Sequence, residues 1–213
     1  MSTPDKTKYA SWAYAEEHAA QNDLVDLARV LANDLGTPAI SEGTAAALTV
    51  LAAAGGSRAI VGIGLGTGLA AASLMHGASA GAVLTGIDAD PDRVAATRQM
   101  LQAQGVAPSR TRLITGKAEQ VLPRLTSGGY DLVFIETDPE QAAEHIDQGL
   151  RLLHPGGMLI LNDALDSDRV PKPAVRQPST QAMRQVESRL REDDAVVTAM
   201  IPTGTGLLTA VRR

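Results

Sequence analysis

Four glycines at alternate positions, with an acidic residue further along, are the residues whose types and spacing most clearly suggest chemistry. Gly62, Gly64, Gly66 and Gly68 end an apolar run. Because glycine has no β-carbon, the backbone there can turn tightly or let a ligand approach. Asp88 ends a second apolar run 20 positions after Gly68, the spacing at which a carboxylate reaches the hydroxyl groups of a ribose. Together these features predict a site for a nucleotide-like cofactor.

Both features also have structural explanations, which stay open. Alanine- and glycine-rich helix packing produces similar strings of glycine, and Asp88 could serve only to cap a loop. Asp90 precedes Pro91, and a carboxylate followed by proline at the first helical position is typical of a helix start. We therefore expect Asp90 to be a helix cap and Asp88 to contact the ribose.

The elements that must position these residues follow from the hydrophobic pattern. From Arg58 onward, short apolar runs alternate with amphipathic segments of helix length, which is typical of βαβ units around a parallel sheet. The predicted parallel strands are 59–63, 83–88, 111–115, 130–136 and 158–162. A helix over 69–76 follows the glycines, and a hairpin over 195–201 and 207–211 predicts an antiparallel pair at the end of the sheet.

The sequence before this alternating region predicts helices. Leucines at helical spacing indicate a second helix that ends at Gly36, and Ser41 is expected to cap a third helix that runs to about Ala54. We expect one domain over 1–213, with 1–57 as a helical cap and 58–213 as an α/β core.

A first helix carries Tyr9, Trp12 and Tyr14, three of the five aromatic residues in the chain. Two interpretations stay open for this cluster. The aromatic side chains either attach the helix to the body of the protein or to a second subunit, or they form a lid over a substrate.

Residues 163–178 are polar and contain three prolines, which predicts a long loop and excludes a helix or central strand. The four histidines form no catalytic constellation. His18, His76 and His145 fall on predicted helices and His154 in a loop, so each is expected at the surface or at its boundary.

Composition excludes several classes of function. The net charge is −5 and no basic run exceeds a pair, so nucleic acid is not an expected partner. The absence of cysteine excludes thiolate chemistry and disulfides. No segment approaches the roughly 18 apolar residues of a membrane span, and none near the start could act as a signal. We expect a soluble, cytoplasmic protein.

The order of these elements resembles the S-adenosylmethionine-dependent O-methyltransferases of the catechol and caffeoyl-CoA type, especially their small actinobacterial relatives. The stretches 130–138 and 152–163 are the most specific. The resemblance implies an α/β, class I methyltransferase (Rossmann-like) fold: a seven-stranded, mostly parallel sheet with an antiparallel C-terminal hairpin, helices on both faces and extra N-terminal helices. It also implies a homodimer.

Carried over position by position, the resemblance implies three groups of residues. The cofactor would contact Ile40, Ser41, Gly62, Gly64, Leu65, Gly66, Gly68, Asp88, Ala89, Gly116, Lys117, Ala118, Glu136 and Asp138. Glu136 and Asp138 would face the reaction, and Glu136, Asn162 and Asp163 would stand where the family binds a divalent metal such as Mg²⁺.

The sequence departs from the family pattern at several of these positions. Gly62 and Lys117 replace acids, and Pro139 replaces the lysine that acts near the substrate hydroxyl. Glu136 replaces an aspartate, and Asn162-Asp163 reverses the usual Asp-Asn order. Swapping neighbours on a strand moves the carboxylate to the other side of the pleat, so a metal is less expected here than the cofactor.

The leading prediction is S-adenosylmethionine-dependent transfer of a methyl group to a hydroxyl of a small molecule, with aromatic hydroxyls as first candidates. One alternative is a homologue that binds the cofactor or S-adenosylhomocysteine without catalysis and serves as an interaction module. A third reading, an NAD-dependent oxidoreductase, shares the glycine loop and Asp88, but the N-terminal helices and the terminal hairpin argue against it.

Overall fold

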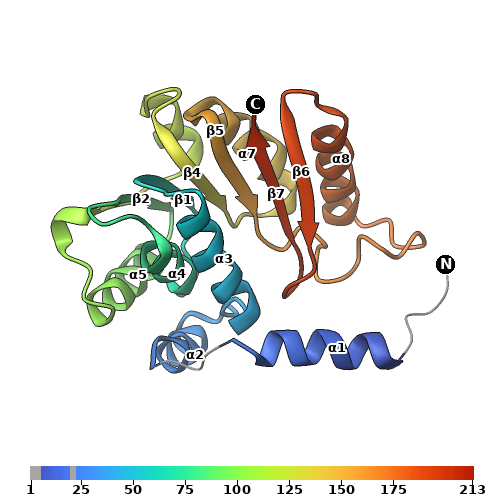
Figure 1. Ribbon diagram of the computed structural model, residues 1–213, viewed down its shortest axis with the longest axis horizontal. Helices are drawn as coiled ribbons and strands as arrows, with labels where there is room; N and C mark the ends of the chain where they lie inside the picture. The colour runs from blue at the N-terminus through green and yellow to red at the C-terminus, as the bar shows by residue number, and fades with distance from the viewer. Residues whose placement is uncertain (1–5, 20–22) are drawn as a thin grey trace.

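The computed structural model describes residues 6–19 and 23–213. Seven strands form one sheet in the order β3-β2-β1-β4-β5-β7-β6 (Figure 1). The strands are β1 Ala59–Ile63, β2 Val83–Asp88, β3 Thr111–Thr115, β4 Tyr130–Ile135, β5 Leu153–Leu161, β6 Val196–Ile201 and β7 Leu207–Arg212. β1 to β5 pair in parallel, whereas β7 pairs antiparallel with both β5 and β6. The predicted sheet with an antiparallel hairpin is confirmed.

Eight α-helices surround this sheet in the described part of the chain. They are α1 Lys6–Glu17, α2 Asp23–Leu35, α3 Glu42–Ala54, α4 Leu69–Gly77, α5 Pro91–Ala103, α6 Ala118–Val121, α7 Ala142–Leu152 and α8 Pro178–Glu192. Short 3₁₀ turns cover Pro108–Arg110, Leu122–Arg124 and Pro139–Gln141. None of the helices in residues 6–19 and 23–213 is long and apolar enough to cross a membrane.

The helices bury both faces of the sheet, as predicted. Side chains alternate along β4, so Leu132 and Phe134 join one core with α2 to α5, while Val133 and Ile135 join a second core with α7 and α8. This double burial explains why the parallel strands are continuous apolar runs.

Two local predictions depend only on neighbouring residues, and both are confirmed. The Ser41 hydroxyl accepts a hydrogen bond from the Thr44 N–H at 3.1 Å and caps α3. Asp90 accepts one from the Asp92 N–H at 2.9 Å and caps α5. Each cap satisfies a backbone donor that the first turn of a helix leaves free.

Strand β5 begins earlier than the sequence predicts. Leu153 pairs with Tyr130, and the pairing then shifts before it resumes at Met158 with Leu132. The glycines Gly156 and Gly157 lie in this irregular stretch. Because paired glycines are typical of turns, the sequence predicts no strand before residue 158.

Segment 163–178 contains neither helix nor strand before α8 begins at Pro178, as predicted. Asp166 fixes the conformation of this loop, because its buried carboxylate accepts hydrogen bonds from Arg169, Ser179 and Thr180. The loop is therefore tied to the start of α8.

The aromatic cluster does not attach α1 to the body. Tyr9 is 54% exposed, Trp12 36% and Tyr14 70%, so that part of the prediction is wrong. Instead, the carboxylate of Glu16 accepts hydrogen bonds from Gly43, Thr203 and Gly204. This single side chain ties the end of α1 to α3 and to the β6–β7 turn, and the rest of α1 extends away from the sheet (Figure 1).

Helix α3 packs closely on α4, the helix that follows the glycine loop. A β-carbon at Gly77 would lie 1.9 Å from the backbone oxygen of Thr49. We expect Gly77→Ala to lower the free energy of unfolding by about 3 kcal/mol, because neither backbone can yield without parting the helices.

Chemical denaturation of the two proteins measures this change. Gly129→Ala is the matched control, since its β-carbon would meet no atom nearer than 3.4 Å. Equal stability of the Gly77 and Gly129 variants would contradict the packing assigned to α3 and α4.

Candidate active site at the strand ends

The backbone hydrogen bonding of the sheet continues for one residue beyond the ends of four strands. Gly64, Gly116, Glu136 and Asn162 follow β1, β3, β4 and β5, and each donates its N–H to a carbonyl oxygen of a neighbouring strand over 2.7–2.9 Å. These bonds fix the backbone at the carboxyl edge of the sheet, where open α/β folds bind ligands.

The glycine loop passes directly over the end of β4. Gly64, Gly66 and Gly68 have φ values of +73°, +51° and +84°, which favour glycine. A β-carbon at Gly64 would lie 1.7 Å from the backbone oxygen of Glu136, and one at Gly66 would lie 3.6 Å from both Glu136 carboxylate oxygens. The loop and Glu136 therefore form one unit.

The other two glycines differ in their surroundings. A β-carbon at Gly68 would lie 2.6 Å from Cα of Thr97 in α5, so close packing requires glycine there, whereas one at Gly62 would meet Leu65 at 3.5 Å, an ordinary contact distance. The helix-packing interpretation thus accounts for Gly68, and only part of the glycine pattern faces a ligand site.

Asp88 is buried at the end of β2 and anchors the glycine loop. Its Oδ2 accepts a hydrogen bond from the Leu65 N–H at 2.8 Å, and its Oδ1 accepts one from the Asp90 N–H at 2.9 Å. Asp88 therefore anchors the loop, while ribose binding stays a prediction. Each carboxylate oxygen can accept a second bond, so the structure also allows Asp88 to bind a ribose.

A cavity of about 530 Å³ opens along this edge of the sheet. We call it the strand-end cavity. Ten of the predicted site residues line it: Gly64, Asp88, Ala89, Gly116, Lys117, Ala118, Glu136, Asp138, Asn162 and Asp163. Six others, Ile40, Ser41, Gly62, Leu65, Gly66 and Gly68, are not among its lining residues, although Leu65 and Gly66 contact Asp88 and Glu136 behind it.

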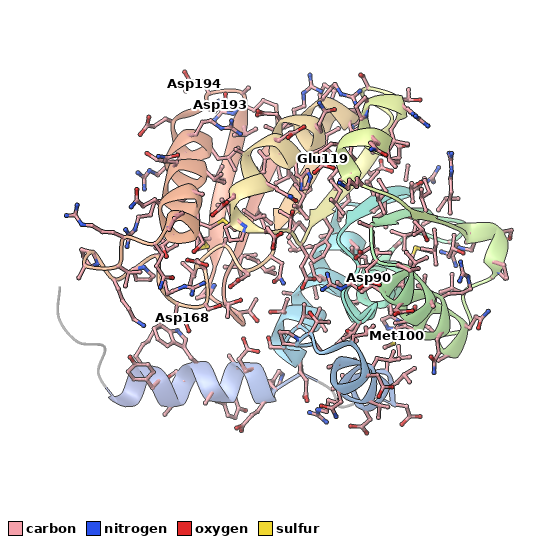
Figure 2. All side chains as sticks on the ribbon, turned by 180° about the vertical axis from the view of Figure 1, so that it is seen from behind. Asp90, Met100, Glu119, Asp168, Asp193 and Asp194 are labelled. Atoms are coloured by element: carbon pink, nitrogen blue, oxygen red, sulfur yellow. The ribbon has the colours of Figure 1, made fainter. Side chains whose placement is uncertain are left out.

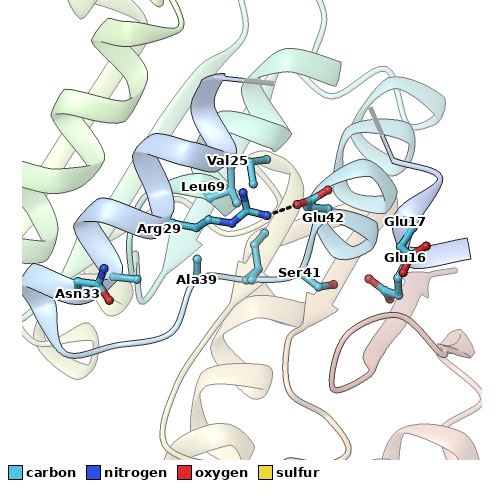
Figure 3. Close-up of a pocket in the computed structure, with 11 residues that line it drawn as sticks. Glu16, Glu17, Val25, Arg29, Asn33, Ala39, Ser41, Glu42 and Leu69 are labelled. Atoms are coloured by element: carbon cyan, nitrogen blue, oxygen red, sulfur yellow. Dashed lines mark hydrogen bonds and ion pairs between the residues drawn. The ribbon is translucent and has the colours of Figure 1, made fainter. Parts of the chain in front are cut away.

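Ile40 and Ser41 line a second cavity of about 600 Å³ among α1, α2 and α3. Figure 3 shows the Arg29–Glu42 ion pair across this helix cavity, with Leu69 of α4 behind it. The segment between α2 and α3 borders both cavities, because Thr37 lines the strand-end cavity and Ala39 to Ser41 line the helix cavity.

The sequence analysis missed several residues of the strand-end cavity, among them Thr37, Arg93, Glu119 and Gln141. It also expected His145 at the surface or at its boundary, which is wrong: this residue is 3% exposed and lines the cavity. A signal was present, since the buried residues of α7, namely Ala142, His145, Ile146, Gly149 and Leu152, follow the helical period.

The other histidines lie where the sequence predicts, at the surface or its boundary. His18 and His76 are exposed. His154 Nε2 lies 2.9 Å from Oδ1 of Asp131, and this hydrogen bond raises the pKa of His154.

Glu136 has the most strongly perturbed acidity in the cavity. Its pKa is raised to about 7: burial is the largest cause, the positive charge of Arg93 lowers the pKa, and the negative charges of Asp163 and Asp88 raise it. A carboxyl group poised near neutrality can exchange a proton at physiological pH.

The predicted metal ligands Glu136, Asn162 and Asp163 all line the strand-end cavity. Oδ1 of Asp163 accepts a hydrogen bond from the Ser167 N–H at 2.8 Å, and a β-carbon at Gly66 would lie 3.6 Å from the Glu136 oxygens. Within residues 6–19 and 23–213, no three His, Cys, Asp or Glu side chains gather closely enough to hold an ion. The predicted set contains only two such acids together with Asn162, so a metal at these residues stays a prediction.

A seven-stranded, mostly parallel sheet with this terminal hairpin, and with a glycine loop beside an acid on β2, defines the class I methyltransferase fold. The sequence profile of the O-methyltransferase family matches residues 13–213. The chain therefore belongs to the O-methyltransferase family.

Relatives from mycobacteria cover nearly the whole chain. A Mycobacterium ulcerans protein that carries the provisional name of O-methyltransferase is 37% identical over 94% of this chain and 89% of its own length. A similarly named Mycobacterium avium protein is 38% identical over 94% of this chain and 90% of its own.

Solved structures share the fold. A Corynebacterium glutamicum protein is 28% identical and superposes with a TM-score of 0.87 over 98% of this chain and 97% of its own. The O-methyltransferase TomG of Streptomyces achromogenes, solved with S-adenosylmethionine, is 20% identical with a TM-score of 0.84 over 99% of each chain. A Bacillus cereus O-methyltransferase, solved with S-adenosylhomocysteine, is 22% identical with a TM-score of 0.83 over 96% of this chain and 97% of its own.

The raised pKa of Glu136 makes stability depend on pH. The folded protein keeps the proton up to about pH 7, whereas the unfolded chain releases it near its ordinary value. Stability is therefore lost as the pH rises between these two values, and Glu136→Gln should raise the free energy of unfolding by about 3 kcal/mol at pH 8 and by under about 1 kcal/mol at pH 5.

Denaturant titrations at both pH values measure this gain. The exposed Glu140→Gln, on the neighbouring 3₁₀ turn, is the control and should leave stability nearly unchanged at either pH. A gain at Glu136 that is the same at pH 5 and pH 8 would contradict the assigned environment.

Proposed function

We propose that this chain transfers the methyl group of S-adenosylmethionine to a hydroxyl group of a small molecule. One observation carries the proposal: the strand-end cavity brings Gly64, Asp88 and Glu136 together on the ends of three adjacent strands. The structures solved with S-adenosylmethionine or S-adenosylhomocysteine, in proteins of the same fold, support the choice of cofactor.

The cavity offers a different contact to each part of the cofactor. Asp88 would accept hydrogen bonds from the ribose hydroxyls, the loop around Gly64 and Gly66 would lie along the methionine part, and Gly116 to Ala118 would contact the adenine. Ile40 and Ser41 remain predictions at the methionine end.

The cofactor supplies an electrophilic methyl group on a sulfonium sulfur. The protein must align the acceptor oxygen with the methyl carbon and remove the hydroxyl proton. Glu136 can take that proton: as the oxygen–carbon bond forms and the carbon–sulfur bond breaks, the proton passes from the hydroxyl to the carboxylate. Asp138 at the same strand end remains a second predicted contact to cofactor and substrate.

Asp88→Ala should weaken binding of S-adenosylhomocysteine by roughly 10- to 100-fold, because hydrogen bonds to a charged group are lost from a buried site. Isothermal titration calorimetry measures the affinity, and NAD serves as the comparison ligand for the oxidoreductase alternative. Asp90→Ala is the control, since Asp90 caps α5 and does not line the cavity.

Asp88→Ala also removes the hydrogen bond that anchors the glycine loop. A second ligand therefore separates the role of Asp88 in ribose binding from its role in anchoring the loop. The wild type should bind S-adenosylhomocysteine more tightly than its 2′-deoxy analogue, and Asp88→Ala should lose that preference. An unchanged preference would show that Asp88 only holds the loop.

Turnover on a panel of phenols and catechols tests catalysis. Because Glu136 removes the proton in our proposal, we expect the rate constant kcat/KM to rise as the pH increases through about 7. We also expect a chelator such as EDTA to leave activity unchanged. Inhibition by the chelator, with recovery in excess Mg²⁺, would contradict this and support a metal on Glu136, Asn162 and Asp163.

Binding without turnover on any acceptor would favour the alternative of a non-catalytic binding protein. Pro139, which stands where the family has a lysine, motivates that alternative.

We also propose that the chain forms a homodimer through α1. The aromatic side chains of this helix are exposed, and Tyr9 packs edge-to-face on Trp12 with ring centroids 5.6 Å apart. Light scattering should give twice the chain mass, and Trp12→Ser with Tyr14→Ser should give a monomer. A monomeric wild type would refute the proposal.

The cytoplasmic location stays a prediction, which cell fractionation tests.

A further inference from the structure

Glu16 connects three parts of the molecule that lie far apart in the sequence. Its Oε1 accepts hydrogen bonds from the Thr203 hydroxyl at 2.6 Å and from the Gly204 N–H at 2.7 Å, both in the β6–β7 turn. Its Oε2 accepts one from the Gly43 N–H at 3.1 Å, in the first turn of α3. Figure 3 shows the carboxylate pointing toward Ser41, the residue that caps α3. One side chain of α1 therefore joins the start of α3 to the β6–β7 turn.

The surroundings of this carboxylate require glycine at two positions. A β-carbon at Gly43 would lie 2.4 Å from Oε2 of Glu16, and one at Gly204, where φ is +51°, would lie 2.6 Å from Oγ1 of Thr44. Burial would raise the pKa of Glu16, but its hydrogen bonds outweigh burial and lower the pKa. The carboxylate is therefore ionised at neutral pH, and its charge strengthens each hydrogen bond that it accepts.

The β6–β7 turn is bonded in the same way to the segment that follows β5. The Ala164 N–H donates to the Gly206 oxygen and the Leu165 N–H donates to the Thr205 oxygen, each over 3.0 Å. A β-carbon at Gly206 would lie 2.6 Å from Cγ of Leu165, so the turn and this segment are closely packed. Figure 2 shows Asp168, further along the segment, on the same side of the sheet as α1. The two residues before Ala164 line the strand-end cavity, and a displaced turn would therefore move this wall of the cavity.

The walls that would hold the cofactor are fixed by other contacts. Gly64 and Gly116 donate their N–H groups to carbonyl oxygens of β2, and Asp88, the last residue of β2, anchors the glycine loop. None of these three bonds involves α1 or the β6–β7 turn. The influence of Glu16 is therefore concentrated at the end of the cavity that Asn162 and Asp163 form.

We propose that Glu16 is a positioning residue for the methyl acceptor. By fixing the β6–β7 turn, it holds the Asn162–Asp163 end of the strand-end cavity in the arrangement that aligns the acceptor hydroxyl with the methyl group. The inference rests on the proposed function, because it requires acceptor and cofactor to meet in this cavity. It gives α1 a role within its own subunit, besides the proposed dimer contact.

Kinetics on the phenol or catechol that the wild type methylates fastest tests this role. Glu16→Ala should lower kcat/KM for the acceptor at least about 10-fold, while the calorimetric affinity for S-adenosylhomocysteine stays within about 3-fold. Glu16→Gln should recover most of the loss, since its amide oxygen can accept the bonds from Thr203 and Gly204. Glu17→Ala is the matched control: Glu17 is the exposed neighbour on the same helix, and its loss should leave both quantities unchanged.

A second variant displaces the Glu16 carboxylate without replacing it. Gly43→Ala puts a methyl group against Oε2 of Glu16, so it should reproduce the loss caused by Glu16→Ala. The variant with both changes should be no worse than either single variant, because both changes break the same contact, whereas independent effects would multiply.

Trp12 is the only tryptophan in the chain, so its fluorescence anisotropy reports on α1 directly. The anisotropy should fall in Glu16→Ala and stay unchanged in Glu17→Ala. A fall in anisotropy with unchanged kcat/KM, an equal loss of kcat/KM and cofactor affinity, or multiplied losses in the double variant would overturn this inference and leave the proposed function intact. A wild type that methylates no acceptor would overturn both. If Glu16→Ala does not fold, Gly43→Ala decides the question.

Discussion

The glycine loop passes so close to the end of β4 that only a residue without a β-carbon fits at position 64. A methyl group there would overlap the backbone oxygen of Glu136, and the φ of +73° favours glycine as well. Asp88 holds the other side of the loop through the N–H of Leu65. The loop, the end of β2 and the end of β4 are therefore fixed relative to one another, and the strand-end cavity takes its shape from them.

This constraint explains the electrostatics of the site. The loop lies against the Glu136 carboxyl on one side, and burial is the main cause of its raised pKa. Asp88 and Asp163 add repulsion, while Arg93 opposes it. An ionised carboxylate is less stable here than an amide would be, and active sites often keep such groups at the expense of stability.

Much of this arrangement can be predicted from local sequence. Ser41 and Asp90 cap their helices through hydrogen bonds within four residues, so their roles depend on nothing distant. His145 lies on the buried face that the helical period of α7 predicts, but its place in the strand-end cavity depends on tertiary packing, which no local pattern specifies. The direction of the Asp163 carboxylate depends on a left-handed backbone, with φ +53°, that its residue type does not dictate. For the same reason, Asp88 has a loop-anchoring role that sequence spacing alone could not separate from ribose binding.

A crystal structure of the chain with S-adenosylhomocysteine tests the central claim most directly. The account predicts density in the strand-end cavity, with the ribose on Asp88, the sulfur near Glu136 and the adenine beside Gly116 to Ala118. Density for the cofactor in the helix cavity around Arg29, or a ribose with no contact to Asp88, would contradict it.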